Sequence, residues 1–205
     1  MSQDYSSTLI AELICTRISH DLIGNIGAVS NAVELLDDDP ECVADVKPIL
    51  EISSKVLADR LKFFRLSFGL SNAAVKNVDE LKTVAKNYVQ TIGNRSFPIE
   101  LDLQINTPQV YKMVLLGIMC MSDIFIKGGV LSVVESQKGL IFTAKSQHML
   151  SGAKLKTVQN VIQGILPDEN PAQNAALVYL QDILKDFGAT INVSYNETEA
   201  VMQIA

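Results

Sequence analysis

Apolar side chains recur at steps of three and four along the first part of the chain, the pattern of a helix that buries one side. Eight positions form this stripe: Ala11, Cys15, Ile18, Leu22, Ile26, Val29, Val33 and Leu36. At about 100° per residue they fall within an arc of about 80°. We therefore predict a helix from about 6 to 36. Three acids and Pro40 end it, because proline continues a helix poorly and like charges oppose the negative end of the helix dipole.

A second apolar stripe predicts another helix, from about 45 to 68, with Gly69 as its stop. Its apolar positions are Ile49, Ile52, Val56, Leu61, Phe64 and Phe68. Pro48 is compatible with this helix only in the first turn. Residues 71–74 are expected to form a linker. Two long helices joined by a short turn form a hairpin, and a lone hairpin with such wide stripes has too little core. We expect two copies to pair into a dimeric four-helix bundle.

From residue 78 onward, helical and alternating patterns follow one another. The predicted helices cover 79–92, 108–127, 155–165 and 174–187. The predicted strands cover 98–105, 130–135, 140–146, 190–194 and 200–204. Such an order favours a mixed sheet with helices on one face. The expected fold class is α+β, with a helical hairpin domain over 1–72 and an α/β sandwich over 73–205.

Composition narrows the range of partners and compartments. A net charge of −6 and a pI near 4.9 argue against binding nucleic acid. The longest apolar run, Met113 to Met121, is about half as long as a membrane span needs to be. The N-terminus lacks the basic and then apolar order of a signal peptide. Three widely spaced cysteines form no zinc-ligand pair and are expected to be reduced. We expect a soluble cytoplasmic protein without a metal site.

His20, one of only two histidines, lies in the first predicted helix and is followed at once by Asp21. It points about 160° away from the centre of the apolar stripe. A histidine on the solvent side of a long helix and next to an acid is well placed to meet a group from outside. The alternative is a surface histidine with no function. His148 has no acid beside it and is taken as structural or incidental.

The residues around His20 carry a resemblance to a known family. Residues 15–22, CTRISHDL, look like the phospho-accepting box of sensor histidine kinases. The longer string CTRISHDLIGNIGAVSNAVELL, with FFRLSFG closing the second helix, resembles the ChpT family of bacterial histidine phosphotransferases. Gly24 and Asn25 stand where kinases usually have a proline. The resemblance implies a dimerisation hairpin followed by a domain shaped like a kinase ATPase domain that has lost its nucleotide site.

The second half of the chain lacks the residues with which kinases hold ATP. The stretch 109–127, in the place of the asparagine box, contains no asparagine for magnesium. No Asp-x-Gly-x-Gly sequence is present to hold the adenine. Residues 174–179 occupy the place of the glycine-rich lid without one glycine, and Gly-x-Gly occurs nowhere in the chain. We therefore expect a retained scaffold, no bound nucleotide and no cofactor.

The resemblance also assigns roles to residues. His20 would be the phospho-acceptor, because neutral imidazole is nucleophilic near pH 7 and its phosphoramidate can pass phosphate to an aspartate. Asp21 would hold the other ring nitrogen and fix the reactive tautomer, unless it is an ordinary solvated charge.

Five neighbours of His20 are candidates for contact with a partner: Arg17, Gly24, Asn25, Gly27 and Asn31. A glycine costs about 1 kcal/mol against alanine inside a helix. Gly24 and Gly27 therefore suggest space for a partner's close approach, with a packing reason as the alternative. Arg17 would contact phosphate or form a surface ion pair.

These observations predict a homodimeric phosphorelay histidine phosphotransferase. It would take phosphate from the receiver domain of a hybrid kinase and donate it to the receiver domain of a response regulator. The receiver would supply the Mg²⁺. Two alternatives stay open, namely an ATP-dependent histidine kinase with a divergent nucleotide site and a non-enzymatic adaptor that docks a receiver. The sequence leaves open the donor, the recipient and the direction of flow.

Overall fold

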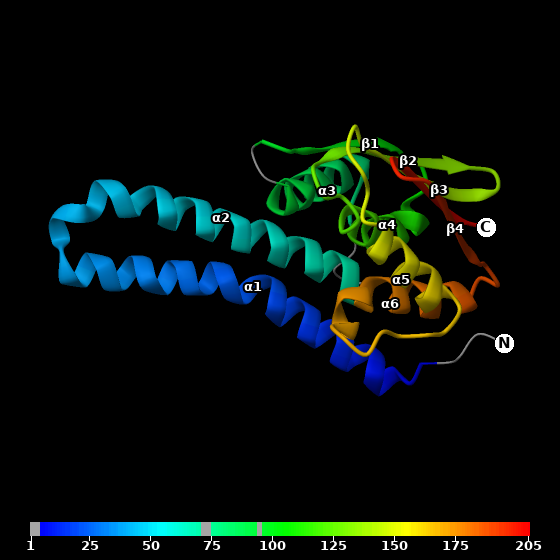
Figure 1. The fold of residues 1–205 in the computed structure, drawn as a ribbon, viewed down its shortest axis with the longest axis horizontal. Coiled ribbons are helices and arrows are strands. Elements are labelled where there is room, and N and C mark those ends of the chain that lie inside the picture. The colour runs from blue at the N-terminus through cyan, green and yellow to red at the C-terminus, as the bar shows by residue number, and fades with distance from the viewer. Residues whose placement is uncertain (1–4, 71–74, 94–95) are drawn as a thin grey trace.

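The computed structural model describes residues 5–70, 75–93 and 96–205, in which a long helical hairpin projects from an α/β unit (Figure 1). The hairpin consists of α1 (Ser7–Asp38) and α2 (Val43–Phe68), joined by the short 3₁₀ helix η1 (Pro40–Cys42). The Ser6 side chain accepts a hydrogen bond from the Leu9 amide and caps the start of α1. The expected linker over 71–74, and with it the boundary between 1–72 and 73–205, lies outside the described residues.

The α/β unit is built on a five-stranded mixed sheet in the order β1-β2-β3-β5-β4. Its strands are β1 (Ile99–Gln104), β2 (Gly129–Ser136), β3 (Gly139–Lys145), β4 (Ile191–Tyr195) and β5 (Glu199–Ile204). β1 and β2 are parallel and the other pairs are antiparallel. Its helices are α3 (Val78–Ile92), α4 (Tyr111–Ser122), α5 (Gly152–Ile162) and α6 (Ala175–Lys185), with the 3₁₀ helices η3 (Pro108–Val110) and η4 (Pro171–Asn174).

α4 forms the centre of the core, and all of its side chains except Lys112 are buried. It comes so close to β3 that a Cβ on Gly117 would lie 2.3 Å from Cζ of Phe142. Only glycine permits this approach, so Gly117 fixes the distance between α4 and the sheet. The expected fold class, a helical hairpin followed by an α/β unit with a mixed sheet, is confirmed. Among the residues that the structure describes, no helix is both long and apolar enough to cross a membrane.

Two local expectations are wrong. The helix predicted over 108–127 ends at Ser122, so its last turn is missing. Pro48 lies inside α2 rather than in its first turn, because the helix already begins at Val43. The carbonyl of Ala44 therefore has no helical donor, but both residues are exposed, where water can satisfy it.

The side chains of α1 that the single chain buries differ from the predicted stripe. Of the eight stripe positions only Leu22 is buried within the chain, whereas Ile10, Leu13, Arg17 and Ala32 are buried outside the stripe. The first turns of α1 pack against η4 and α6, and those contacts select another face of the helix. Beyond them the hairpin extends away from the α/β unit, and α2 alone covers α1 (Figure 1).

Candidate functional site

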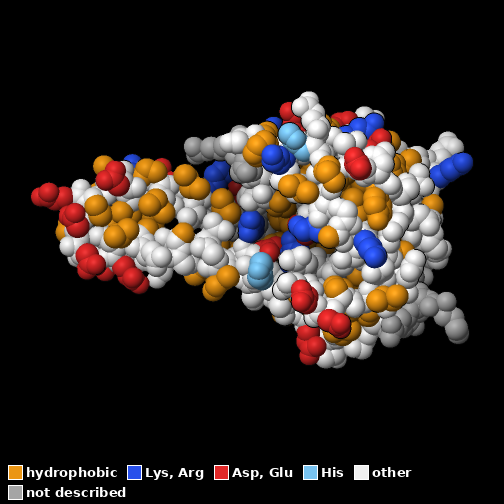
Figure 2. Space-filling model, viewed as in Figure 1, with side chains coloured by type: hydrophobic (Ala, Val, Ile, Leu, Met, Phe, Trp, Pro, Cys, Tyr) orange, Lys and Arg blue, Asp and Glu red, His pale blue; other side chains and the backbone are white. Residues whose placement is uncertain are grey.

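His20 lies on α1 where the hairpin leaves the α/β unit. Its side chain is 74% exposed. It borders a groove of about 390 Å³ between α1 and the segment around η4, with Leu13, Thr16 and Pro171 among the other walls. Figure 2 shows acidic, basic and histidine side chains gathered at this junction, whereas the projecting hairpin carries apolar side chains together with acidic ones toward its tip. His20 is therefore open to a partner and stands beside a concave surface.

Asp21 holds the ring of His20 from one side. Its Oδ1 lies 3.3 Å from Nδ1 of His20, and its Oδ2 accepts from Nε of Arg17 at 2.7 Å. A carboxylate only accepts hydrogen bonds, so this contact favours the neutral tautomer with the proton on Nδ1, in which the Nε2 lone pair is free. The Asp21 side chain is only 15% exposed, which differs from a freely solvated helix charge.

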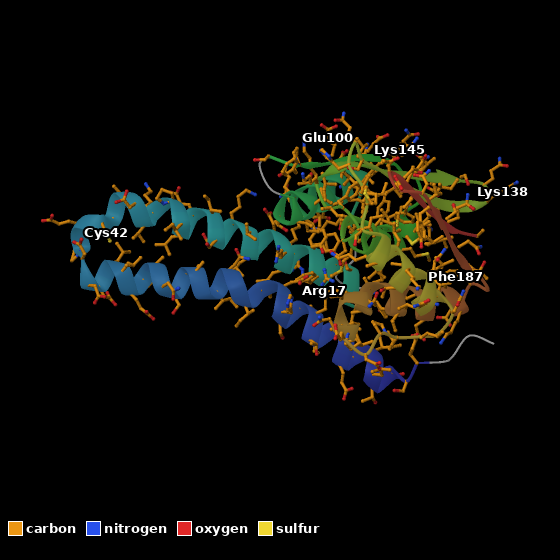
Figure 3. The ribbon with its side chains drawn as sticks, in the orientation of Figure 1. Arg17, Cys42, Glu100, Lys138, Lys145 and Phe187 are labelled. Atoms are coloured by element: carbon orange, nitrogen blue, oxygen red, sulfur yellow. The ribbon has the colours of Figure 1, made fainter. Side chains whose placement is uncertain are left out.

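Arg17 occupies a different place from the surface position expected for it. It is buried, at 6% exposure, between the hairpin and the α/β unit (Figure 3). Its Nη1 and Nη2 donate to Asp123 at 2.8 and 3.2 Å, and Nη1 also donates to the Gln173 carbonyl at 3.0 Å. Burial lowers the pKa of Arg17, but the charge of Asp123 opposes burial and the net pKa is raised. The guanidinium is a buried cation that donates four hydrogen bonds within the chain.

Two residues of this site were missed from the sequence, Asp123 and Arg60. Asp123 follows the last residue of α4, where an acid opposes the helix dipole. That unfavourable position is a sequence signal for a cationic partner, although it does not identify Arg17. Arg60 on α2 donates to the backbone carbonyl of Asp21 and to both Thr91 oxygens on α3. It ties the turn of α1 that carries His20 to the neighbouring helices, and no local sequence pattern distinguishes it.

The remaining candidates lie along α1 beyond His20, toward the hairpin tip. Gly24 and Gly27 have open space beside them, because an added Cβ would meet no described atom within 4 Å. A packing reason within the chain therefore does not account for them. Asn25 is half-buried and Asn31 is exposed. Asn31 is about 16 Å along the helix from His20, so it lies outside the group formed by His20, Asp21 and Arg17.

A cavity of about 160 Å³ lies on the other side of the Arg17–Asp123 pair, among α4, α5 and the 167–174 segment. Its walls include Asp123, Lys154 and Leu177. The Lys154 Nζ donates to the Asp123 backbone carbonyl at 2.6 Å. His148 lies elsewhere, with its ring edge-on to Phe97 at 6.0 Å. Within the described parts of the chain, no group of three or more His, Cys, Asp or Glu residues could hold a metal ion.

A helical hairpin that presents an exposed histidine, with a carboxylate beside its ring, next to an α/β unit is an arrangement suited to phosphotransfer through that histidine. The family described as "Histidine phosphotransferase C-terminal domain" matches residues 78–199, more than half of the chain. The chain belongs to this histidine phosphotransferase family.

A curated relative supports the expected resemblance to ChpT. "Protein phosphotransferase ChpT" of Brucella abortus (strain 2308) is 32% identical over 81 residues, which cover 38% of each protein. The match therefore spans well under half of that relative.

Among solved structures, "1.7 Angstrom Structure of a Bacterial Phosphotransferase" covers all of both chains, with a TM-score of 0.79 and 20% identity. That likeness confirms the fold. The blue-light activated histidine kinase of Erythrobacter litoralis, with 13% identity, covers 91% of this chain and 62% of its own at a TM-score of 0.38, too low to support an argument.

Proposed function

We propose that this chain is a cytoplasmic phosphorelay protein that carries a phosphoryl group on His20. It accepts the group from the aspartyl phosphate of one receiver domain, that of a hybrid kinase, and donates it to the aspartate of a response regulator. The observation that carries the proposal is the geometry of His20. The ring is exposed and its Nδ1 lies 3.3 Å from a carboxylate oxygen, so that a proton on Nδ1 leaves the Nε2 lone pair free for attack.

The transfer step follows from that tautomer. The Nε2 lone pair of His20 attacks the phosphorus of the aspartyl phosphate, the N–P bond forms, and the P–O bond to the aspartate breaks with its electron pair on the departing carboxylate. The proton stays on Nδ1. The ring becomes cationic, and Asp21 stabilises that charge at hydrogen-bond distance. Donation to the second receiver is the reverse of this step.

We propose that the receiver domain supplies the Mg²⁺ for this chemistry. Both oxygens of Asp21 and both oxygens of Asp123 already face Arg17 or His20. Neither carboxylate is therefore available as a metal ligand at this site. The groove beside His20 gives a receiver a concave surface formed by both α1 and η4.

We further propose that the chain does not bind ATP. The cavity beside Asp123 has about 160 Å³, and the Asp123 carboxylate is occupied by Arg17. The missing asparagine and glycine-rich lid support the same conclusion.

We propose that the functional form is a homodimer joined through the hairpin. Four apolar side chains that the sequence pattern expects to be covered are 43–51% exposed in the single chain: Ile26, Val33, Ile49 and Ile52. A second copy of the hairpin would cover them in a four-helix bundle. His20 points away from this surface, so the dimer would present two His20 side chains on opposite outer faces.

The test is transfer of radiolabel from purified receiver domains. Each receiver encoded in the same genome is charged with labelled acetyl phosphate and mixed with wild-type protein or with the variants His20→Ala and His148→Gln. We expect wild type and His148→Gln to take acid-labile phosphate and His20→Ala to take none. His148→Gln is the matched control because it removes the chain's other histidine, which is also exposed.

Label on His20→Ala would overturn the assignment of His20. A receiver that binds the wild-type protein without transferring label would favour the adaptor alternative. Label that arrives from Mg-ATP in the absence of any receiver would favour the kinase alternative.

A further inference from the structure

We propose that Asp123, on the α/β unit, is a positioning residue for His20 and acts through Arg17 and Asp21. The inference rests on the proposed role of His20 and adds a function for the second half of the chain. Four contacts connect the two residues. Asp123 accepts from Nη1 and Nη2 of Arg17, Nε of Arg17 donates to Asp21 at 2.7 Å, and Asp21 lies 3.3 Å from Nδ1 of His20.

The guanidinium of Arg17 transmits position because it is rigid and planar. Its five N–H bonds point in fixed directions within one plane. When the two terminal nitrogens dock on Asp123, the direction of the Nε–H bond is set, and in this structure that bond points at Asp21. The Gln173 carbonyl accepts a further hydrogen bond from Nη1 and fixes the same plane from η4.

Asp123 also determines which N–H bonds of Arg17 are available to Asp21. Arginine prefers to bind a carboxylate through two parallel N–H bonds. Because Asp123 takes the two terminal nitrogens, Asp21 receives one bond, to Oδ2, and keeps Oδ1 for His20. Without the charge of Asp123, the guanidinium can turn and take both oxygens of Asp21. His20 would then lose the acceptor that holds its proton on Nδ1.

Burial strengthens the competition between Asp123 and Asp21 for the guanidinium of Arg17. The side chain of Arg17 is 8% exposed and that of Asp123 is 22% exposed, so water screens their attraction poorly. Arg60 holds the backbone carbonyl of Asp21, which fixes the helix at this point and leaves the side chain of Asp21 as the movable part. The orientation of that side chain then depends on where Arg17 is anchored.

A purely structural role for the pair predicts something different. In that case Arg17 and Asp123 would only fasten the hairpin to the α/β unit, and their loss would lower stability without changing the imidazole of His20. The tautomer of His20 separates the two roles, because the ¹⁵N chemical shifts of the ring nitrogens report which of them carries the proton.

The experiment uses full-length protein with ring-¹⁵N histidine in a His148→Gln background, so that His20 gives the only imidazole signals. We expect the Nδ1–H tautomer to dominate in the parent protein. Asp123→Asn should move the ring toward a mixture of tautomers and slow phosphate acceptance from the best receiver about tenfold, as loss of a charged hydrogen bond does. Asp123→Glu should restore part of both. Arg17→Lys keeps the charge without the planar fork and should resemble Asp123→Asn.

The matched control is Glu80→Gln, which removes the carboxylate of another ion pair between elements, with Lys62 at 3.3 Å, away from His20. It should leave both tautomer and rate at the parent values. If folded Asp123→Asn and Arg17→Lys both keep the parent tautomer, the proposal is wrong and the pair is structural. The tautomer result decides this even if wild-type protein takes no label from any receiver, an outcome that would overturn the proposed function instead.

Discussion

Arg17 and Asp123, 106 positions apart in the chain, form a two-contact ion pair at 2.8 and 3.2 Å that joins the first helix of the hairpin to the end of α4. Among the residues that the structure describes, Arg17 is the only buried arginine, and this pair connects the two parts of the structure. The turn of α1 that carries His20 is thereby held against the α/β unit. The hairpin and the α/β unit are therefore joined by Arg17, three positions before the histidine proposed to carry phosphate.

Breaking this pair from the arginine side should destabilise the protein. Arg17→Met keeps the length of the side chain but leaves the Asp123 carboxylate without its cation. Removing one partner of a buried ion pair costs roughly 3 kcal/mol at the lower end of the usual range, which is appropriate because Asp123 is partly exposed. Urea unfolding followed by circular dichroism should show this loss. A loss below about 1 kcal/mol, as for exposed pairs, would contradict it.

Gly24→Ala should separate stability from function. An added Cβ meets no described atom within 4 Å, so the fold accepts it, and alanine should stabilise the helix by about 1 kcal/mol. The melting temperature should rise by about 2–4 °C. If the open space admits a receiver, transfer to or from His20 should nevertheless slow. The matched control is Gly152→Ala in α5, where the space is equally open. Equal transfer rates for both variants would show that Gly24 does not face the partner.

The second half of the chain should not bind nucleotide. Calorimetric titration of the wild-type protein with Mg-ATP is expected to show no binding at millimolar concentration, because the asparagine and the glycine-rich lid of kinases are missing and Asp123 is paired with Arg17. A micromolar isotherm would favour the kinase alternative. Repeating the titration with Arg17→Met asks whether release of Asp123 is enough to restore affinity.

Cys120 should make stability fall in alkaline solution. Burial, and then the charge of Asp123, raise the pKa of its thiol. The unfolded thiol loses its proton near pH 8.5 whereas the folded thiol keeps it, so the unfolded state binds fewer protons and is favoured as pH rises. The effect is at most about 1.4 kcal/mol per pH unit above that point. Cys120→Ala should remove it. At pH 8, native protein should react with a thiol reagent at the exposed Cys15 and not at Cys120.

The sequence was sufficient for what is local and insufficient for what depends on distant contacts. Helices and strands follow from periodicity, so each predicted element from 79 onward exists in the structure, although the helix predicted to 127 ends at Ser122. The buried face of α1 could not be read in the same way. The first turns of α1 pack against η4 and α6, and the buried Arg17 binds Asp123 and Gln173, so periodicity within α1 contains no information about these distant partners.

In the candidate site, too, local patterns could be read from the sequence and distant contacts could not. His20 and Asp21 were found because they are adjacent and lie on the polar side of one helix. The sequence identifies Arg17 as a candidate but predicts an exposed side chain, since an arginine on the polar face of a helix is normally exposed. Its burial depends on Asp123, whose position at the end of α4 is visible in the sequence only as an unfavourable charge.

The apolar side chains of the hairpin lead to the last prediction, a stable homodimer joined through residues 6–70. Ile26, Val33, Ile49 and Ile52 are each close to half exposed in the single chain. Burying an aliphatic side chain contributes roughly 1.5–3 kcal/mol, so leaving several in water is costly against a net stability of roughly 5–15 kcal/mol. Ile26→Asp should therefore split or unfold the dimer, and a charge at the half-buried Val29 should act likewise. Asn31→Asp, on the exposed face of the same helix, is the control and should leave the dimer intact. Sedimentation of the wild-type protein as a well-folded monomer at micromolar concentration would contradict the prediction.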